Sequence, residues 1–181
     1  MTVSQILGCA SATNKRIKHD FYETPAWCIH ALARVEQPYW RGLDFWEPCD
    51  GAGSISRVLR SYGRKVVTGD LTRNRNFLKT ETRRAKAIVT NPPYKHATEF
   101  ILHAHRLGVA YHAWLLKGDF LNAQRAIPLI DEVGYPERVW ALTKRPDFRN
   151  QDAPPMNCSW YIFTWRRRTS AALRLLAPDD D

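Results

Sequence analysis

The stretch Leu43-Asp44-Phe45-Trp46-Glu47-Pro48-Cys49-Asp50-Gly51-Ala52-Gly53 decides the fold of this sequence. Its first four residues predict a short strand. Its two glycines permit a tight turn, because a residue without a Cβ adopts backbone angles that are closed to other residues. A helix with apolar residues on one side follows and ends near Gly63. The next strand, residues 65–70, has Asp70 at its carboxyl end. The order strand, glycine turn, helix, strand is typical of an α/β fold.

The rest of the chain continues this alternation. A helix before the first strand is predicted to start with Thr24 as its cap and Pro25 as its first residue, and to stop near Gln37-Pro38. Further along, the pattern predicts strands at 87–90, 109–116 and 158–165, helices at about 97–106 and 120–131, and an apolar segment at 138–142. Such alternation predicts a mostly parallel sheet with helices on both faces. We therefore predict a doubly wound α/β fold.

The length of the chain predicts a single domain. It has 181 residues, and domains cluster around 100 to 150 residues, so a second domain for target recognition does not fit. We expect a flexible basic arm at 1–19, one domain at 20–168 and a disordered acidic tail at 169–181. The 27 Lys and Arg against 18 Asp and Glu leave a net charge of +9. That charge favours a polyanionic partner such as nucleic acid, although a basic surface serves solubility equally well.

The composition argues against several classes of protein. The longest apolar runs are far shorter than the ~20 residues that span a bilayer, so we expect no membrane segment. The four cysteines show no C-x-x-C spacing and the six histidines no H-E-x-x-H arrangement. We therefore expect free thiols and no metal site. Scattered cysteines and a start that does not resemble a secretory signal predict a cytoplasmic protein.

The glycine turn and Asp70 predict a nucleoside-binding site. In an open α/β sheet, ligands bind outside the carboxyl ends of the strands. The turn is not a G-x-G-x-x-G pattern, because the third residue after Gly53 is Ser56, and the chain contains no G-x-x-x-x-G-K-[ST]. Dinucleotides and nucleoside triphosphates therefore lose support. An acid at the position of Asp70 accepts hydrogen bonds from the two hydroxyls of a ribose.

A second loop, Asn91-Pro92-Pro93-Tyr94, follows the predicted buried strand 87–90. Two prolines fix the backbone and remove two N–H donors, so the groups left to face a substrate are acceptors. These acceptors are the Asn91 side-chain oxygen and the Pro92 carbonyl, which together suit an NH2 group. Tyr94 adds a flat surface for a planar group.

With these two loops, the sequence resembles the S-adenosylmethionine-dependent amino-methyltransferases. The likeness is strongest to the DNA N6-adenine methyltransferases, whose tetrapeptide begins with Asn or Asp and continues Pro-Pro-Tyr, Phe or Trp. It covers most of residues 20–165, and Arg145-Pro146-Asp147-Phe148 and Cys158-Ser159-Trp160 resemble the later part of small phage-encoded members. The resemblance implies a Rossmann-like class I methyltransferase fold with a seven-stranded, mostly parallel sheet. It also implies methylation of adenine N6 in DNA, in a bacterial cell or phage-infected host.

The resemblance also implies site residues. Asn91, Pro92, Pro93 and Tyr94 would form the catalytic motif. The residues that would hold S-adenosylmethionine are Tyr22, Thr24, Pro25, Glu47, Pro48, Cys49, Gly51, Gly53, Asp70, Leu71, Asn76 and Phe77. Asn76 stands where the family often has Asp, and its amide oxygen still offers an acceptor to the adenine of the cofactor.

The expected partner is DNA, and the sequence leaves alternatives open. Basic residues that would meet phosphates are Lys15, Arg16, Lys18, Lys117, Arg125 and Arg145. For Lys117 and Arg125 a solvated face is the simpler interpretation. Related motifs act on amino groups of RNA or on protein glutamine, and a catalytically silent nucleic-acid-binding protein would keep the same fold. The oligomeric state, monomer or dimer, stays open. Trp160 and Trp165 are expected in the core.

Overall fold

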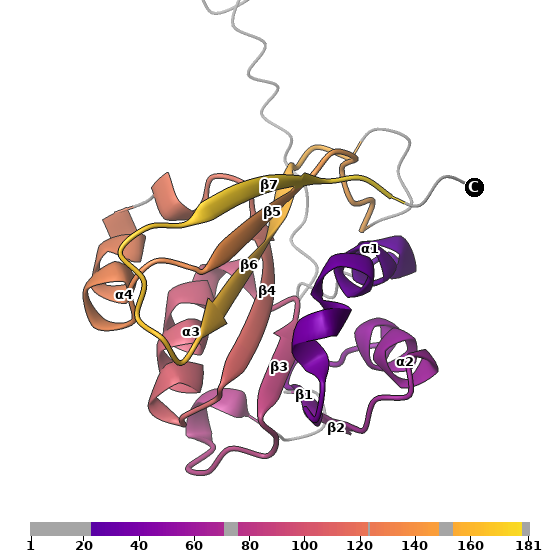
Figure 1. The fold of residues 1–181 in the computed structure, drawn as a ribbon, viewed down its shortest axis with the longest axis horizontal. Helices are drawn as coiled ribbons and strands as arrows, with labels where there is room; N and C mark the ends of the chain where they lie inside the picture. Colours follow the sequence, from indigo (N-terminus) through magenta and orange to yellow (C-terminus); the bar gives the residue numbers. More distant parts are fainter. Residues whose placement is uncertain (1–22, 71–75, 123, 149–153, 179–181) are drawn as a thin grey trace, which may run out of the picture.

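The computed structural model describes residues 23–70, 76–122, 124–148 and 154–178. It contains a seven-stranded sheet and four α-helices (Figure 1). The strands are β1 (Phe45–Glu47), β2 (Val66–Thr68), β3 (Ala87–Thr90), β4 (Tyr111–Lys117), β5 (Arg138–Leu142), β6 (Cys158–Thr164) and β7 (Ala172–Leu176). The helices are α1 (Ala26–Glu36), α2 (Ser54–Ser61), α3 (Ala97–Arg106) and α4 (Ile127–Glu132). Short 3-10 turns lie at Gln37–Trp40, Phe77–Lys79, Tyr94–His96, Phe120–Asn122 and Gln124–Ala126.

The sheet has the order β2-β1-β3-β4-β6-β5-β7 and is mostly parallel, as predicted. Every neighbouring pair is parallel except the two pairs that involve β6, which runs antiparallel to β4 and β5. From β1 the chain passes to β2 on one side and then returns to β3 on the other side. This reversal of strand order opens a crevice at the carboxyl ends of β1 and β3, where α/β sheets bind ligands.

Helices cover both faces of the sheet, which confirms the doubly wound prediction. Alternate residues of each strand point to opposite faces, so Phe45 packs in the cluster with α1 and α2, whereas its neighbour Trp46 packs in the cluster with α3. Figure 1 shows α1 and α2 on one side of the sheet and α3 and α4 on the other. All four residues of β3 are buried, as expected for a parallel strand covered on both faces.

Trp160 is in the core, but Trp165 is not. Trp160 is fully buried and its Nε1 donates a hydrogen bond to the Cys28 carbonyl of α1 at 3.0 Å. Trp165 lies one residue beyond the end of β6 and is 68% exposed, with the Arg166 guanidinium 5.1 Å from the centre of its ring. The prediction failed for Trp165 because the strand ends before it, so no helix covers it.

Two predicted helices have different starts. The helix predicted at 120–131 is divided into two 3-10 turns followed by α4, and Pro128 lies in the first turn of α4. A proline has no N–H to donate to the preceding turn, so it fits the start of a helix and not its interior. Helix α1 begins at Ala26 with Pro25 at the capping position. The Thr24 hydroxyl does not cap this helix and instead accepts a hydrogen bond from Asn91.

The C-terminal segment corrects the predicted disordered tail at 169–181. Residues Ala172–Leu176 form β7, which pairs in parallel with β5 from Arg138 opposite Ala172 to Leu142 opposite Leu176. Leu176 is buried, and its carbonyl accepts a hydrogen bond from the Thr143 N–H at 3.0 Å. The tail was predicted to be disordered from the charge of its last residues, although an apolar run precedes them. The predicted arm at 1–19 lies outside the described residues, and within them no helix is long and apolar enough to cross a membrane.

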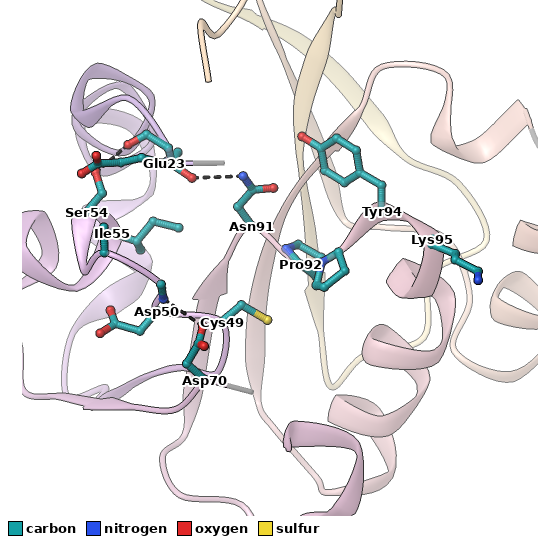
Figure 2. Close-up of a pocket in the computed structure, with 14 residues that line it drawn as sticks. Glu23, Cys49, Asp50, Ser54, Ile55, Asp70, Asn91, Pro92, Tyr94 and Lys95 are labelled. Atoms are coloured by element: carbon teal, nitrogen blue, oxygen red, sulfur yellow. Dashed lines mark hydrogen bonds between the residues drawn. The ribbon is translucent and has the colours of Figure 1, made fainter. Parts of the chain in front are cut away.

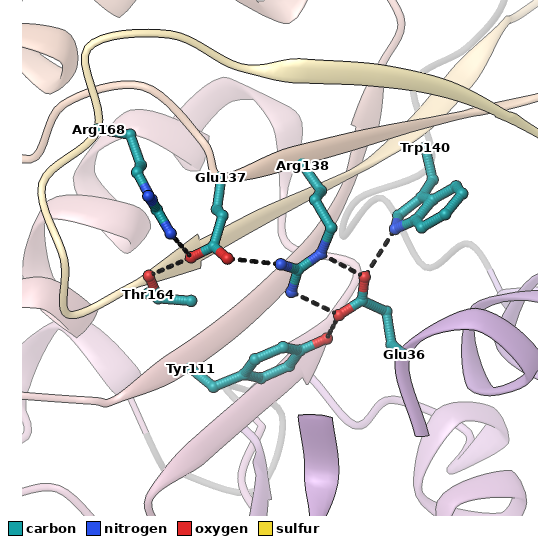
Figure 3. Close-up of polar contacts among 7 residues, drawn as sticks. All are labelled: Glu36, Tyr111, Glu137, Arg138, Trp140, Thr164 and Arg168. Carbon is teal, nitrogen blue, oxygen red and sulfur yellow. Dashed lines mark hydrogen bonds and ion pairs between the residues drawn. The ribbon is translucent and has the colours of Figure 1, made fainter. Parts of the chain in front are cut away.

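A buried carboxylate fixes the end of α1 to the sheet (Figure 3). Both oxygens of Glu36 accept hydrogen bonds, from Arg138 Nε at 2.7 Å, Arg138 Nη2 at 2.9 Å, Trp140 Nε1 at 2.7 Å and the Tyr111 hydroxyl at 3.1 Å. The Glu36 side chain is fully buried and that of Arg138 is 6% exposed. Glu137 pairs with the other side of the Arg138 guanidinium at 2.6 Å.

Candidate active site

A cavity of about 180 Å³ lies at the carboxyl ends of β1, β2 and β3, at the reversal of strand order. Figure 2 shows its walls, which come from the segment before α1, the turn between β1 and α2, the end of β2 and the loop after β3. The lining residues are Glu23, Thr24, Cys49, Asp50, Gly51, Ala52, Ser54, Ile55, Asp70, Asn91, Pro92, Pro93, Tyr94 and Lys95. The two loops predicted from the sequence therefore meet in one cavity.

The turn between β1 and α2 depends on its glycines. Gly51 has a φ of 51° and Gly53 a φ of 84°, a region that other residues seldom adopt. Hydrogen bonds hold the turn in place: the Asp50 N–H donates to the Gly69 carbonyl at 2.9 Å, and the Gly69 N–H donates to the Glu47 carbonyl at 2.8 Å. These bonds extend the pairing of β1 with β2 and bring Asp70 beside the turn.

Carboxylates dominate the charge of this cavity. Asp70 is largely buried, and its Oδ2 accepts a hydrogen bond from the Gly51 N–H at 3.0 Å. Glu23 and Asp50 also line the cavity, whose cation is Lys95. Figure 2 shows the Lys95 side chain directed away from Asn91. A cavity with three acids in a chain of net charge +9 suits a cationic or hydroxyl-rich ligand.

Glu47 supports the cavity from behind without lining it. Its Oε1 accepts hydrogen bonds from the Thr90 hydroxyl at 2.5 Å and the Cys49 N–H at 2.7 Å, and so connects the end of β1 with the end of β3. The side chain is fully buried. Burial raises the pKa of Glu47 well above its usual value, because the charged form loses its hydration. Burial thus favours the protonated form, and Glu47 acts as a structural acid that joins the ends of β1 and β3.

Asn91 presents an unpaired acceptor to the cavity. Its Nδ2 donates to Thr24 Oγ1 at 3.1 Å, whereas its Oδ1 is buried and has no hydrogen-bond partner among the described residues. Figure 2 shows this oxygen turned toward the side of the cavity that holds Tyr94. A buried acceptor without a partner costs about 1–3 kcal/mol, and each such group in a native structure needs an explanation. A ligand that donates an N–H would supply the missing bond.

Tyr94 forms the opposite wall. Its ring is half-buried beside the two prolines, and its hydroxyl lies 3.6 Å from the Cys158 sulfur of β6. That contact holds the outer end of the ring on the side toward which the Asn91 oxygen is turned. The cavity thus combines an N–H acceptor with an aromatic surface, the arrangement expected for a planar group that bears an amino substituent.

The structure brings half of the predicted catalytic and cofactor residues to the lining of this cavity. The lining includes eight of them: Thr24, Cys49, Gly51, Asp70, Asn91, Pro92, Pro93 and Tyr94. Pro25, Glu47, Pro48 and Gly53 stand in the same segments without lining the cavity. Tyr22 and Leu71 lie outside the described residues.

Asn76 and Phe77 line a second cavity of about 610 Å³ beside β2. The Asn76 Oδ1 accepts a hydrogen bond from the Leu78 N–H at 3.0 Å, so this acceptor is already used to start a 3-10 turn. Phe77 is buried, with its ring centre 4.9 Å from that of Trp46 and 5.1 Å from that of Phe100. Neither residue lines the cavity that holds Asp70 and Asn91.

Sequence reasoning missed six lining residues: Glu23, Asp50, Ala52, Ser54, Ile55 and Lys95. Glu23 directly precedes Thr24, and Lys95 directly follows Tyr94. Both could have been predicted from their position next to a predicted site residue. The remaining four lie in or just after the glycine turn. The turn was therefore located correctly, but the side chains that face inward depend on the positive φ angles of its glycines.

Two of the basic residues predicted to meet phosphates, Lys117 and Arg145, are described, and neither lines the cavity. Lys117 is exposed at the end of β4, and Arg145 Nε donates to the Asn157 Oδ1 at 2.9 Å. Lys15, Arg16 and Lys18 lie outside the described residues, as does the side chain of Arg125. Within the described part of the chain, no group of three His, Cys, Asp or Glu side chains is arranged to hold a metal ion.

No protein-family model and no curated protein matches the sequence. Solved structures are similar in fold at low identity. A proposed class I S-adenosylmethionine-dependent methyltransferase from Listeria monocytogenes matches with a TM-score of 0.64 and 11% identity, over 88% of this chain and 67% of its own. A proposed RNA methyltransferase from Pyrococcus horikoshii matches with a TM-score of 0.54 and 15% identity, over 79% of this chain and 85% of its own.

The third match is the modification subunit of a proposed type I restriction enzyme from Vibrio vulnificus. It has a TM-score of 0.56 and 12% identity, over 85% of this chain, which spans only 46% of the subunit. At identities this low, the matches show that the strands and helices are arranged alike and do not show a shared activity. The chain has the Rossmann-like class I methyltransferase fold.

Proposed function

We propose that this protein transfers a methyl group from S-adenosylmethionine to the N6 amino group of adenine in DNA. The observation that carries the proposal is the free Oδ1 of Asn91, buried in a cavity at the reversal of strand order. The class I methyltransferase fold and the Asn-Pro-Pro-Tyr loop support the same reading.

The cavity fits the cofactor on three counts. Asp70 stands at the end of β2, where a carboxylate accepts hydrogen bonds from ribose hydroxyls. The glycine turn leaves room close to the backbone. The carboxylates of Glu23, Asp50 and Asp70 favour a ligand that carries a sulfonium and an ammonium group. When bound, S-adenosylmethionine supplies an electrophilic methyl group and leaves as the neutral thioether.

The loop after β3 would act on the substrate. The Asn91 Oδ1 and the Pro92 carbonyl accept the two hydrogens of the adenine amino group, which makes the nitrogen lone pair available for attack. The same two oxygens would stabilise the positive charge that develops on nitrogen. Tyr94 stacks on the base, which must leave the duplex to reach the cavity. The surplus proton then leaves the methylated nitrogen, and no covalent enzyme intermediate is required.

The choice of DNA rests on charge and on the family resemblance. A net charge of +9 favours a nucleic acid over a protein substrate. We expect relaxed or short-site specificity, with any sequence preference coming from short loops. Methylation of RNA or of a protein glutamine, and nucleic-acid binding without catalysis, are the outcomes that would replace this proposal.

Transfer of a labelled methyl group to DNA, RNA and protein tests the proposal. We expect label in DNA as N6-methyladenine, identified by mass spectrometry after digestion to nucleosides. Asn91→Ala is expected to abolish most of the transfer while cofactor binding persists, and Thr164→Val at the opposite end of the sheet serves as a control. Label only in RNA or protein would overturn the DNA assignment. Cofactor binding without transfer to any substrate would overturn the enzyme assignment.

A further inference from the structure

The carboxamide of Asn91 is held by a chain of hydrogen bonds that begins on another element. The Ser54 hydroxyl, in the first residue of α2, donates to the Thr24 carbonyl at 2.5 Å. The Thr24 hydroxyl in turn accepts from the Asn91 Nδ2 at 3.1 Å. All three residues line the cavity, and Figure 2 shows Ser54 on the side of the cavity away from Tyr94.

We propose that Thr24 is a positioning residue that acts through Asn91, with Ser54 as its support. An amide side chain presents an oxygen at one end and an NH2 at the other. In the structure Thr24 engages the NH2 end and the oxygen end is left without a partner. The reverse orientation would set the Asn91 NH2 against the substrate amino group, two donors without an acceptor. The proposal rests on the proposed function, since it concerns how that site holds its substrate amino group.

The geometry favours this role over a direct cofactor contact for the Thr24 side chain. Thr24 is only 4% exposed, and its hydroxyl already bonds to Asn91. A β-branched side chain has few accessible rotamers, so the hydroxyl stays where the backbone places it. The Ser54 bond fixes that backbone to the start of α2, which follows the glycine turn. A loose Asn91 would still bind substrate in part, but its oxygen would not be aimed before the reaction.

Thr24→Val and Thr24→Ser separate the two roles, because valine keeps the shape of threonine without the hydroxyl and serine keeps the hydroxyl. For Thr24→Val we expect about a tenfold fall in kcat, the effect of one lost hydrogen bond, with cofactor Kd changed less than twofold. Thr24→Ser should retain kcat within about twofold. Ser54→Ala should give a smaller fall in kcat than Thr24→Val. The double variant should show the same fall in kcat as Thr24→Val alone, since both residues act through the same series of hydrogen bonds.

Thr164→Val is the matched control, because Thr164 also loses a hydroxyl bond, to Glu137 at 2.7 Å, at the far end of β6. A tenfold loss of cofactor affinity in Thr24→Val with kcat unchanged would overturn the inference, as would equal activities of the valine and serine variants.

A readout independent of turnover is the NMR signal of the Asn91 side-chain NH2, assigned by its loss in Asn91→Ala. Thr24→Val should shift this signal and speed its proton exchange, and Thr24→Ser should not. If the wild type transfers no methyl group, the proposed function fails, and the NMR comparison still decides whether Thr24 positions Asn91. An Asn91 signal that is identical in the wild type and Thr24→Val would overturn the positioning role.

Discussion

Removal of the Glu36 carboxylate is expected to cost more stability than any surface ion pair of this protein. Glu36 accepts four hydrogen bonds while fully buried, and Arg138 is almost as inaccessible. Taking away one partner of a buried ion pair typically costs about 3–5 kcal/mol, because the other charge stays behind without compensation. Glu137 still pairs with Arg138 at 2.6 Å, so we expect Glu36→Ala to lie near the lower end, at about 3 kcal/mol.

Urea unfolding followed by tryptophan fluorescence measures this loss. Since a domain has about 5–15 kcal/mol of stability in total, Glu36→Gln is the second variant in case Glu36→Ala does not fold. It removes the charge but keeps one oxygen for Trp140 or Tyr111, and should be less harmful.

The matched control is Glu132→Ala. Glu132 also makes two bonds to one guanidinium, of Arg106 at 2.8 Å each, but both side chains are largely exposed. Its loss should move the unfolding midpoint little. If Glu132→Ala and Glu36→Ala shift the midpoint equally, burial does not increase the contribution of the Glu36 network to stability, and the reasoning fails.

Three further predictions concern the cofactor and pH. Asp70→Ala should weaken S-adenosylmethionine binding by about 10-fold to 100-fold through loss of charge-assisted hydrogen bonds, measured by titration calorimetry against the exposed Asp44→Ala; an unchanged Kd would remove the ribose role. Burial lowers the pKa of His112 to about 3, so between pH 7 and pH 5 the unfolded chain binds a proton that the folded chain does not. The free energy of unfolding should therefore fall by about 2 kcal/mol from pH 7 to pH 5, and the fall should be smaller in His112→Asn. Glu47 has a raised pKa, so its contribution is present below the unfolded pKa and is lost as pH rises; the stability of Glu47→Gln relative to wild type should therefore increase from pH 5 to pH 8.

The sequence predicted the part of the fold that depends on local signals. The strand before Glu47, the glycine turn and the strand 87–90 were recognisable because apolar runs end at residues with special backbone preferences. Helix 97–106 was predicted with the bounds that the structure gives. The class of the fold follows from such alternation alone, since only a few topologies join parallel strands through helices.

The parts that failed depend on contacts distant in the sequence. β7 exists because β5 offers an edge, and no pattern within 169–181 reveals that edge. Thr24 looked like a helix cap because its next residue is proline, but its hydroxyl bonds to Asn91, 67 positions away. The cofactor role of Asn76 stays a prediction, and the structure adds that its Oδ1 accepts a hydrogen bond from the Leu78 N–H. Motif spacing identifies which residues carry chemistry, whereas their orientation is set by the packed structure.

The pairing of β7 with β5 affects where the chain can be shortened. A protein ended at residue 168, the boundary that the sequence suggested, would lose the whole of β7 and uncover β5, including the Leu142 side chain. It would also lose the carbonyl of Ala177 that accepts from Arg34 Nη2 on α1 at 2.6 Å. Leu173 and Leu175, 71% and 75% exposed on this outer strand, would be removed at the same time. Trimming for solubility would therefore exchange two surface leucines for an open strand edge, a known template for aggregation.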